Sequence, residues 1–363
     1  ALYWLREYHI DALRLDALHA IFDMSAKHFI RQLVERVDKQ SEKLAKTHYL
    51  IGESDLNDVR LLKPISEGGY GLDSQWSDDF HHSLHALLTR ESFGYYQDCG
   101  ASSDMSKALA EGFVYDWKYS RFRKRNHGSS SRNRPARQFV ISAQNHDQVG
   151  NRIRGDRFTQ TLDFERLKLA AGCLLLSPYI PMLFMGEEYG EDNPFQYFVS
   201  MNDPDLAEAI SLGRAEEFVG FQWQGECPEP QDEKTFQRSK LDWDKRTTGH
   251  NKVLLDFYKK LIQLRKAIPA FVSKDGLTAG GIDEREIVYM LRNFQQSEWL
   301  CLMNFSEQTQ TFACPAVGVP VQKILDSADS QWQGPGATAP GEITGTQKIE
   351  MPPSSISVYV SKR

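Results

Sequence analysis

Short apolar segments alternate with amphipathic segments along most of this chain, and polar residues follow the apolar segments directly. Apolar runs predict strands, and apolar residues at helical spacing predict helices. The strands are expected over 10–16, 48–52, 139–143 and 181–185, and the helices over 25–46, 164–176 and 254–268. This alternation predicts a parallel α/β sheet or barrel, in which the chemistry sits at the carboxyl ends of the strands.

The pattern changes near residue 276, where short alternating segments separated by Gly, Pro and Ser begin. Segments 287–291, 299–303 and 356–360 predict the strands of a small antiparallel β domain. We therefore expect two domains, over 1–275 and 276–363. Within the first domain, residues 194–240 are rich in Glu, Gln, Pro and Gly and are expected to form a long loop at the barrel mouth.

The composition favours a globular enzyme and argues against two classes of partner. The chain has 363 residues, 40% of them hydrophobic, and a formal net charge of −6. Because no basic face offsets the acidic excess, nucleic acid and anionic membranes are not expected partners. The basic run 121–126, followed by Arg132, Arg134 and Arg137, is interpreted as a solvated loop in preference to an anion site.

Targeting signals and cysteine spacing add little to this picture. No stretch approaches the roughly 18 consecutive apolar residues of a membrane span, and Arg6, Glu7 and His9 stand where the core of a signal peptide would lie. A cytoplasmic location is therefore predicted. The five cysteines form no C-x-x-C pair and are interpreted as reduced structural thiols in preference to a metal or redox site.

Three acidic residues, Asp16, Glu53 and Asp147, follow predicted strands. Arg14 lies two residues before Asp16, so on what is expected to be a buried strand its guanidinium shares a face with that carboxylate. A retaining glycoside hydrolase needs one ionised carboxylate and one protonated carboxyl group on either side of the scissile bond. Asp16 suits the first role, and Glu53, with no basic neighbour in sequence, suits the second.

Each of these residues also has an ordinary structural interpretation. A single acid at the end of a strand is as often a helix cap or a surface ion pair, and His19 alone is more often a hydrogen-bonded core residue than a ligand. No H-E-x-x-H or phosphate-loop pattern is found, so neither a metal nor a cofactor is predicted. Trp76, Trp223 and Trp243 could stack on sugar rings or lie in the core.

Three motifs together resemble the α-amylase superfamily, glycoside hydrolase family 13. Asp-Ala-Leu-Arg-Leu-Asp at 11–16, Ile-Gly-Glu at 51–53 and Asn-His-Asp at 145–147 look like its second, third and fourth sequence regions, in the right order. The resemblance implies a (β/α)₈ barrel followed by a β-sandwich. It places Asp16 after barrel strand 4 as the nucleophile, Glu53 after strand 5 as the proton donor, and Asp147 after strand 7 as the residue that steadies the transition state.

Within the superfamily, most of residues 1–245 resemble the maltooligosyltrehalose trehalohydrolase family. The likeness is carried by segments 14–19, 53–58, 75–82, 144–152, 183–190 and 238–243. The resemblance also implies a set of substrate contacts in three segments. These are Arg14, Leu15, Ala17, Leu18 and His19; Asp78, Asp79, Phe80, His81 and His82; and His146, Gln148, Val149, Gly150 and Asn151.

Two departures from the superfamily pattern stand out. Ala12 occupies a position where the family usually has Gly, and we expect it to be tolerated. The first sequence region, at the end of strand 3, has no match, so the resemblance covers strands 4–8 and leaves open sheet edges. The chain is then the C-terminal part of a longer polypeptide, a proteolytic or split product whose other half binds alongside, or an inactive remnant. The first two are favoured.

The leading functional prediction is hydrolysis of the α-1,4 bond next to the terminal trehalose of a maltooligosyltrehalose, which serves trehalose biosynthesis. The expected partners are a maltooligosaccharide-type substrate and the missing N-terminal part of the same protein. A glucan branching enzyme with the same acids is the nearest rival, and segment 76–82, Trp-Ser-Asp-Asp-Phe-His-His, favours the trehalohydrolase. A non-catalytic glucan-binding module is the rival from another class, but the presence of all three acids argues against it.

Overall fold

The computed structural model describes residues 1–219, 227–295 and 297–361. Its centre is a five-stranded parallel sheet with the strand order β1-β2-β3-β6-β7. The strands are β1 (Ala12–Leu15), β2 (Tyr49–Gly52), β3 (Ser74–Trp76), β6 (Phe139–Ser142) and β7 (Ile180–Met182). Because all four strand pairs are parallel, the carboxyl ends of the five strands lie along one edge of the sheet.

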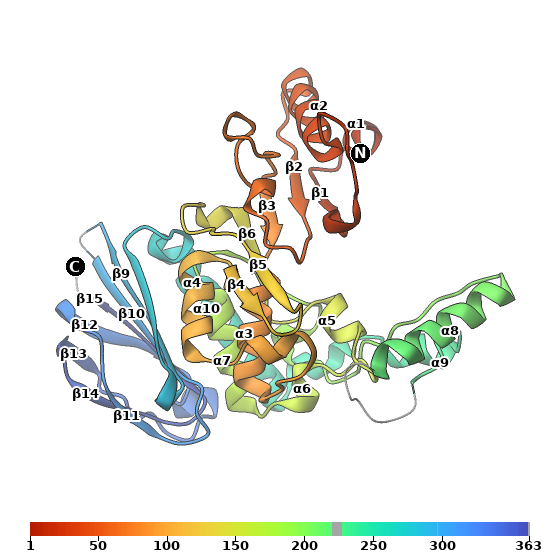
Figure 1. Cartoon of the computed structure of the whole chain (residues 1–363). Coiled ribbons are helices and arrows are strands. Elements are labelled where there is room, and N and C mark those ends of the chain that lie inside the picture. Colours follow the sequence, from red (N-terminus) through yellow and green to blue (C-terminus); the bar gives the residue numbers. More distant parts are fainter. Residues whose placement is uncertain (220–226, 296, 362–363) are drawn as a thin grey trace.

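Helices connect the strands and cover the sheet (Figure 1). They are α1 (Leu2–Glu7), α2 (Phe29–Leu44), α3 (Asp78–Thr89), α4 (Ser102–Glu111), α5 (His146–Gly150), α6 (Phe158–Thr161), α7 (Phe164–Leu175) and α10 (Gly249–Ala267). The apolar residues of α10 recur at helical spacing, and Leu254, Phe257, Tyr258, Leu261 and Leu264 are buried in the largest core cluster. That cluster also contains residues of α3, α4, α7 and the C-terminal strands, so one core joins the helices to the second sheet.

The second sheet is antiparallel, with the order β13-β12-β15-β10-β9-β8. Its strands are β8 (Leu277–Ile282), β9 (Ile287–Phe294), β10 (Ser297–Asn304), β12 (Val317–Asp326), β13 (Glu342–Gly345) and β15 (Ser355–Ser361), and a separate pair joins β11 (Gln310–Ala313) to β14 (Lys348–Met351). A second apolar cluster lies between this six-stranded sheet and the β11–β14 pair. The parallel sheet followed by antiparallel β-sheets agrees with the predicted fold class.

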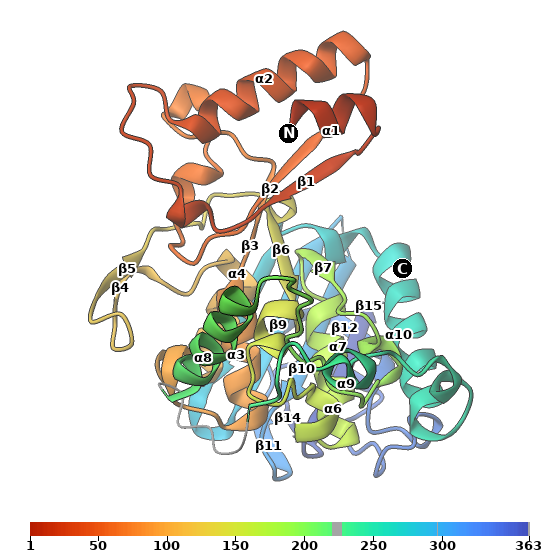
Figure 2. The same cartoon turned by 90° about the vertical axis from the view of Figure 1, so that its right-hand side faces the viewer.

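The N-terminal elements α1, β1, α2 and β2 project from the rest of the molecule (Figures 1 and 2). They have a small core of their own, which includes Leu5, Ile30, Val34 and Leu50. All four residues of β1 are only half-buried. The prediction of a buried strand at this position is therefore wrong, because β1 is an edge strand that pairs with β2 alone among the described strands.

Three regions differ from the sequence expectation. The predicted loop over 194–240 contains two helices, α8 (Pro204–Val219) and α9 (Glu233–Arg238), and α8 projects as the extended arm in Figure 1. The basic run, expected to be a solvated loop, forms the turn and second strand of a hairpin, β4 (Asp116–Ser120) and β5 (Arg125–Gly128). Strand β3 was not predicted, because its sequence, Ser-Gln-Trp, contains one apolar residue.

The described helices include none whose length and apolar content would allow it to cross a bilayer.

Candidate active site

The ends of β1, β2 and β6 bring the three predicted acids together around Arg14. Asp16 directly follows β1, Glu53 directly follows β2, and Asp147 lies in the first turn of α5 after β6. Arg14 Nη1 donates a hydrogen bond to Asp16 Oδ1, and Arg14 Nη2 lies 3.7 Å from Glu53 Oε2 and 3.6 Å from Asp147 Oδ2. One guanidinium thus offsets the charge of three carboxylates that follow three different strands.

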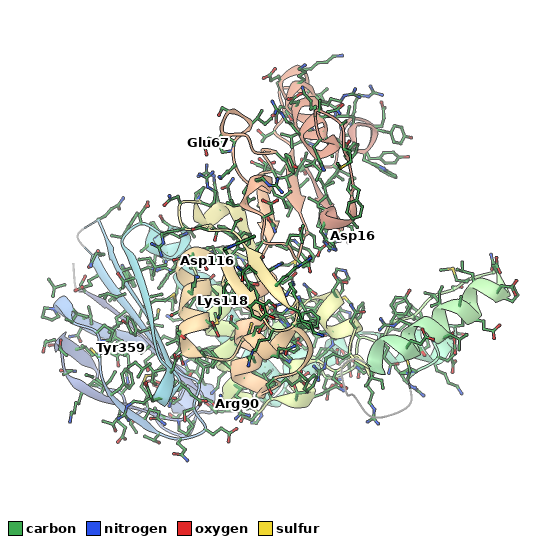
Figure 3. All side chains as sticks on the ribbon, in the orientation of Figure 1. Asp16, Glu67, Arg90, Asp116, Lys118 and Tyr359 are labelled. Atoms are coloured by element: carbon green, nitrogen blue, oxygen red, sulfur yellow. The ribbon has the colours of Figure 1, made fainter. Side chains whose placement is uncertain are left out.

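Backbone contacts fix Glu53 against the loop that follows β1. The amide of Ala17 donates to Glu53 Oε2 at 2.7 Å, and Ala17 reaches this position in a left-handed conformation with φ of 45°. The amide of Leu18 donates to the Glu53 carbonyl, and the Glu53 amide donates to the Leu15 carbonyl, both at 2.9 Å. The side chain of Glu53 is consequently 15% exposed, whereas that of Asp16, at the tip of β1 in Figure 3, is 77% exposed.

Glu53 was singled out because it has no basic neighbour in the sequence, but in the folded chain it does have one. Arg14 is 39 positions away along the chain but its guanidinium lies 3.7 Å from the Glu53 carboxylate. Parallel pairing of β1 with β2 causes this approach, since Arg14 is in register with Ile51, two residues before Glu53.

A pocket of about 310 Å³ opens beside these acids. Acidic, amide, basic and aromatic side chains from loops after β1, β2, β3 and β6, together with the β4–β5 hairpin, form its walls. The lining residues are His19, Glu53, Asp55, Trp76, Asp78, His82, Tyr95, Phe122, Arg123, Asp147, Gln148 and Asn151. Asp16 reaches this group through Arg14 and is not itself part of the lining.

Asp78 occupies the first turn of α3 in the pocket wall, where it accepts a hydrogen bond from Gln148 Nε2 at 3.3 Å. Burial, followed by the nearby carboxylates of Glu53, Asp79 and Asp147, raises the pKa of Asp78 to about 7. Desolvation and like charge both disfavour the ionised form of a carboxyl group. The Asp78 side chain can therefore donate as well as accept a hydrogen bond near neutral pH.

The structure separates the predicted contacts on α3 into two groups. Asp78 and His82, one helical turn apart, line the pocket. Asp79 is buried and accepts hydrogen bonds from Asn57 Nδ2 and from the amides of Val114 and Tyr115 at 2.8, 2.6 and 3.1 Å. Phe80 is fully buried in the main core. Asp79 and Phe80 therefore lie outside the pocket wall, because consecutive residues of a helix face different directions, and their contact with substrate stays a prediction.

Several other predicted contacts also lie outside the pocket wall. The His81 ring bonds to the Ala143 carbonyl at 2.7 Å and to the Tyr96 hydroxyl at 2.9 Å and is buried. Leu18, Val149 and Gly150 are buried as well and do not line the pocket, so their contact with substrate stays a prediction. Leu15 and Ala17 act in the structure through their backbone contacts to Glu53, and His146 lies with its ring 6.1 Å from that of Trp76.

The pocket also contains residues outside the predicted contact set. Asp55, Tyr95, Phe122 and Arg123 line it, and so does Trp76, which was considered only as a stacking residue and whose ring lies 4.3 Å from the Arg14 guanidinium. Asp55 could have been found from its position two residues beyond Glu53, and Arg123 from the basic run. Among the other tryptophans, Trp243 is about half-exposed beneath Arg246, and Trp223 lies outside the described residues.

Comparisons with known proteins relate the chain to one group of enzymes. No protein-family model matches. Malto-oligosyltrehalose trehalohydrolases from Saccharolobus solfataricus and Rhizobium sp. are each 46% identical over 73% of this chain, and the one from Deinococcus radiodurans is 34% identical over 85%. This chain covers 44%, 45% and 51% of those relatives, so it spans about half their length. Over the matched residues the chain is homologous to these enzymes.

Solved structures give the same relationship at the level of the fold. A Salmonella typhimurium protein described as a candidate α-amylase superposes on 99% of this chain with a TM-score of 0.84 and 32% identity, and 59% of that protein is covered. The α-amylase from H. orenii superposes on 99% of this chain with a TM-score of 0.57 and 18% identity, and 62% of that amylase is covered. The arrangement of the parallel sheet and the C-terminal β-sheets is therefore that of α-amylases.

Proposed function

We propose that this chain supplies the catalytic carboxylates of a retaining glycoside hydrolase that releases trehalose from maltooligosyltrehalose. The observation that carries the proposal is the meeting of Asp16, Glu53 and Asp147 around Arg14, at the carboxyl ends of three parallel strands and beside a 310 Å³ pocket. Relatives 43–46% identical that are named malto-oligosyltrehalose trehalohydrolase support this choice of substrate.

In the proposed mechanism the two principal acids have different environments. Asp16, exposed and hydrogen-bonded to Arg14, attacks the anomeric carbon and forms a covalent glycosyl-enzyme. Glu53, held by the Ala17 amide, gives its proton to the leaving oxygen and then removes one from the water that hydrolyses the intermediate. Asp147 hydrogen-bonds to hydroxyl groups of the distorted sugar ring.

The pocket walls fit a glucan. Trp76 and Tyr95 offer aromatic rings for the apolar faces of sugars, and Asp78, Gln148 and Asn151 offer hydrogen-bonding groups for hydroxyls. By analogy with the α-amylases, β1, β2, β3, β6 and β7 correspond to barrel strands 4 to 8. The division into domains at residues 275 and 276 is part of the same proposal, and the cytoplasmic location and the N-terminal partner stay predictions.

Incubation with maltotriosyltrehalose tests the proposal, with released trehalose measured by chromatography. Asp16→Asn and Glu53→Gln should each lower the rate by about 10³-fold or more, since both remove a group that acts in the transition state. Asp11→Asn is the matched control. Asp11 precedes the same strand, but its carboxylate lies 2.8 Å from Lys46 Nζ and does not line the pocket. Undiminished trehalose release by Asp16→Asn would sink the assignment.

A glucan branching enzyme is the second candidate, because one from Pseudoalteromonas atlantica is 24% identical over 56% of this chain, though only 27% of that enzyme is covered. It would pass the glycosyl unit to another glucan and not to water. New branch points in iodine-stained amylose, without trehalose release, would favour it. Absence of both products would favour a glucan-binding remnant.

A further inference from the structure

Asp55 connects four segments that meet at the edge of the pocket. Its Oδ2 accepts a hydrogen bond from Arg123 Nη2 at 3.1 Å, and its Oδ1 lies 3.6 Å from His19 Nδ1. Its carbonyl accepts a hydrogen bond from His127 Nε2 at 2.8 Å. Asp55 thereby joins the loop after β1, the loop after β2, the turn of the β4–β5 hairpin and strand β5.

The hairpin pairs only with itself among the described strands, so side chains determine how it sits on the molecule. At its base, labelled by Asp116 and Lys118 in Figure 3, it is fixed to α4 by the Lys107–Asp116 and Lys118–Asp104 ion pairs, at 2.7 and 3.2 Å. These contacts hold the strands but do not reach the pocket. Two contacts reach the pocket-lining turn. The Phe122 amide donates to Asp98 Oδ2 at 3.3 Å, and Arg123 donates to Asp55, which itself lines the pocket and belongs to the loop that carries Glu53.

Arg123 is held in the pocket wall by that contact. Its side chain is 12% exposed, and its guanidinium lies 5.6 Å from the Tyr115 ring and 5.7 Å from the Phe122 ring. A guanidinium has five N–H donors in a planar fork, so a bond from one Nη to Asp55 fixes the plane and leaves other donors for a ligand. Hydroxyl oxygens of a sugar are acceptors of the required kind.

We propose that Asp55 is a positioning residue that orients Arg123 toward the bound glucan and couples the hairpin to the loop carrying Glu53. This inference rests on the proposed function for the identity of the ligand as an α-1,4-linked glucan. Asp55 acts through Arg123 and need not touch the sugar. Its effect is therefore expected on substrate binding more than on the chemical step.

A double-mutant cycle of Asp55→Asn and Arg123→Gln tests the coupling. Each single variant should raise the KM for maltotriosyltrehalose by about tenfold with a smaller change in kcat, the size expected for one charge-assisted hydrogen bond. The double variant should bind no worse than Arg123→Gln alone, because the first residue acts through the second. Asp55→Glu should recover part of the lost affinity, and Asp116→Asn, at the hairpin base, should leave KM unchanged.

Additive losses in the double variant would overturn the proposal, and so would a fall in kcat alone or an equal effect of Asp116→Asn. Calorimetric titration of maltopentaose into Glu53→Gln backgrounds measures the same cycle without turnover. Coupling seen there while the unaltered chain releases no trehalose would refute the proposed function and leave the role of Asp55 standing. Trehalose release without coupling in either measurement would refute the role of Asp55 and leave the proposed function standing.

Discussion

The Asp78 carboxyl group makes stability depend on pH, because burial and the carboxylates around it raise its pKa to about 7 from a usual value of 3.8. The folded chain keeps this proton while the unfolded chain loses it, so the contribution is complete below pH 4 and is lost as pH rises toward 7. Asp78→Asn can still accept from Gln148 and has no such loss. Its melting temperature relative to the unaltered chain should rise between pH 5 and pH 8.

The size of that relative gain should be on the order of 2 kcal/mol, since one pKa unit corresponds to about 1.4 kcal/mol and the pocket wall is partly open to solvent. Thermal unfolding followed by circular dichroism at pH 5, 6, 7 and 8 measures it. Asp11→Asn is the control: Lys46 lowers the pKa of Asp11, so its contribution is lost at acid pH and stays constant over this range. Parallel curves for Asp78→Asn and the unaltered chain would contradict the prediction.

At the same scale, sequence reasoning brought together only those site residues that follow strands. Asp16, Glu53 and Asp147 could be grouped because parallel strands end at one edge of a sheet. The contact between Asp55 and Arg123 spans 68 residues and depends on how a hairpin folds back, which no local pattern encodes. The contiguous motif 78–82 was carried over whole, but only Asp78 and His82 line the pocket, because residues four apart share one face of a helix and those between them face elsewhere.

Among the elements, helix α3 has one face in the main core and another in the pocket wall. Phe80, Leu84 and Leu87 are fully buried in the main core, whereas His82 lines the pocket and stacks on Tyr95 with ring centroids 4.7 Å apart. Phe80→Ala should lower the free energy of unfolding by about 3 to 5 kcal/mol through loss of burial and a new cavity. His82→Ala should stay folded and weaken glucan binding.

Urea unfolding and calorimetric titration of maltopentaose separate these two effects. Leu87→Ala provides a second core variant, with an expected loss of about 2 to 5 kcal/mol and no change in affinity at urea-free, fully folded conditions. If His82→Ala destabilised the chain as much as Phe80→Ala while binding glucan normally, the division of α3 into a core face and a pocket face would be wrong.

The elements themselves were predicted where apolar periodicity was strong. The helix expected over 254–268 is α10 (Gly249–Ala267), and the strand expected over 48–52 is β2 (Tyr49–Gly52). Strand β3 was missed because its burial comes from neighbours on both sides and not from its own composition. Helix α8 was missed because the surrounding Glu, Gln, Pro and Gly are typical of loops.

At the scale of the whole molecule, the N-terminal elements join the main body through the parallel sheet. Among the described strands, no other sheet contains strands from both parts. β2 and β3 share only two register pairs, Ile51 with Ser74 and Gly52 with Gln75. Among the described strands, β1 and β7 each have one neighbour. Large apolar side chains nearby are exposed, including Phe22 at 90% and Met24 at 98%. From this arrangement we expect the N-terminal elements to be held to the main body less firmly than α7 and α10 are.

Hydrogen exchange measured by mass spectrometry should therefore show the amides of α2 opening at a free energy at least about 2 kcal/mol below those of α7 and α10, because few buried contacts hold α2 to the main core. Leu50→Ala, in the N-terminal core, should speed exchange in α2 and leave α10 unchanged. Leu261→Ala, in α10, should speed exchange in the main body without a matching change in α2. Uniform protection across α2, α7 and α10, with both variants affecting all three, would mean that the chain unfolds as one cooperative unit.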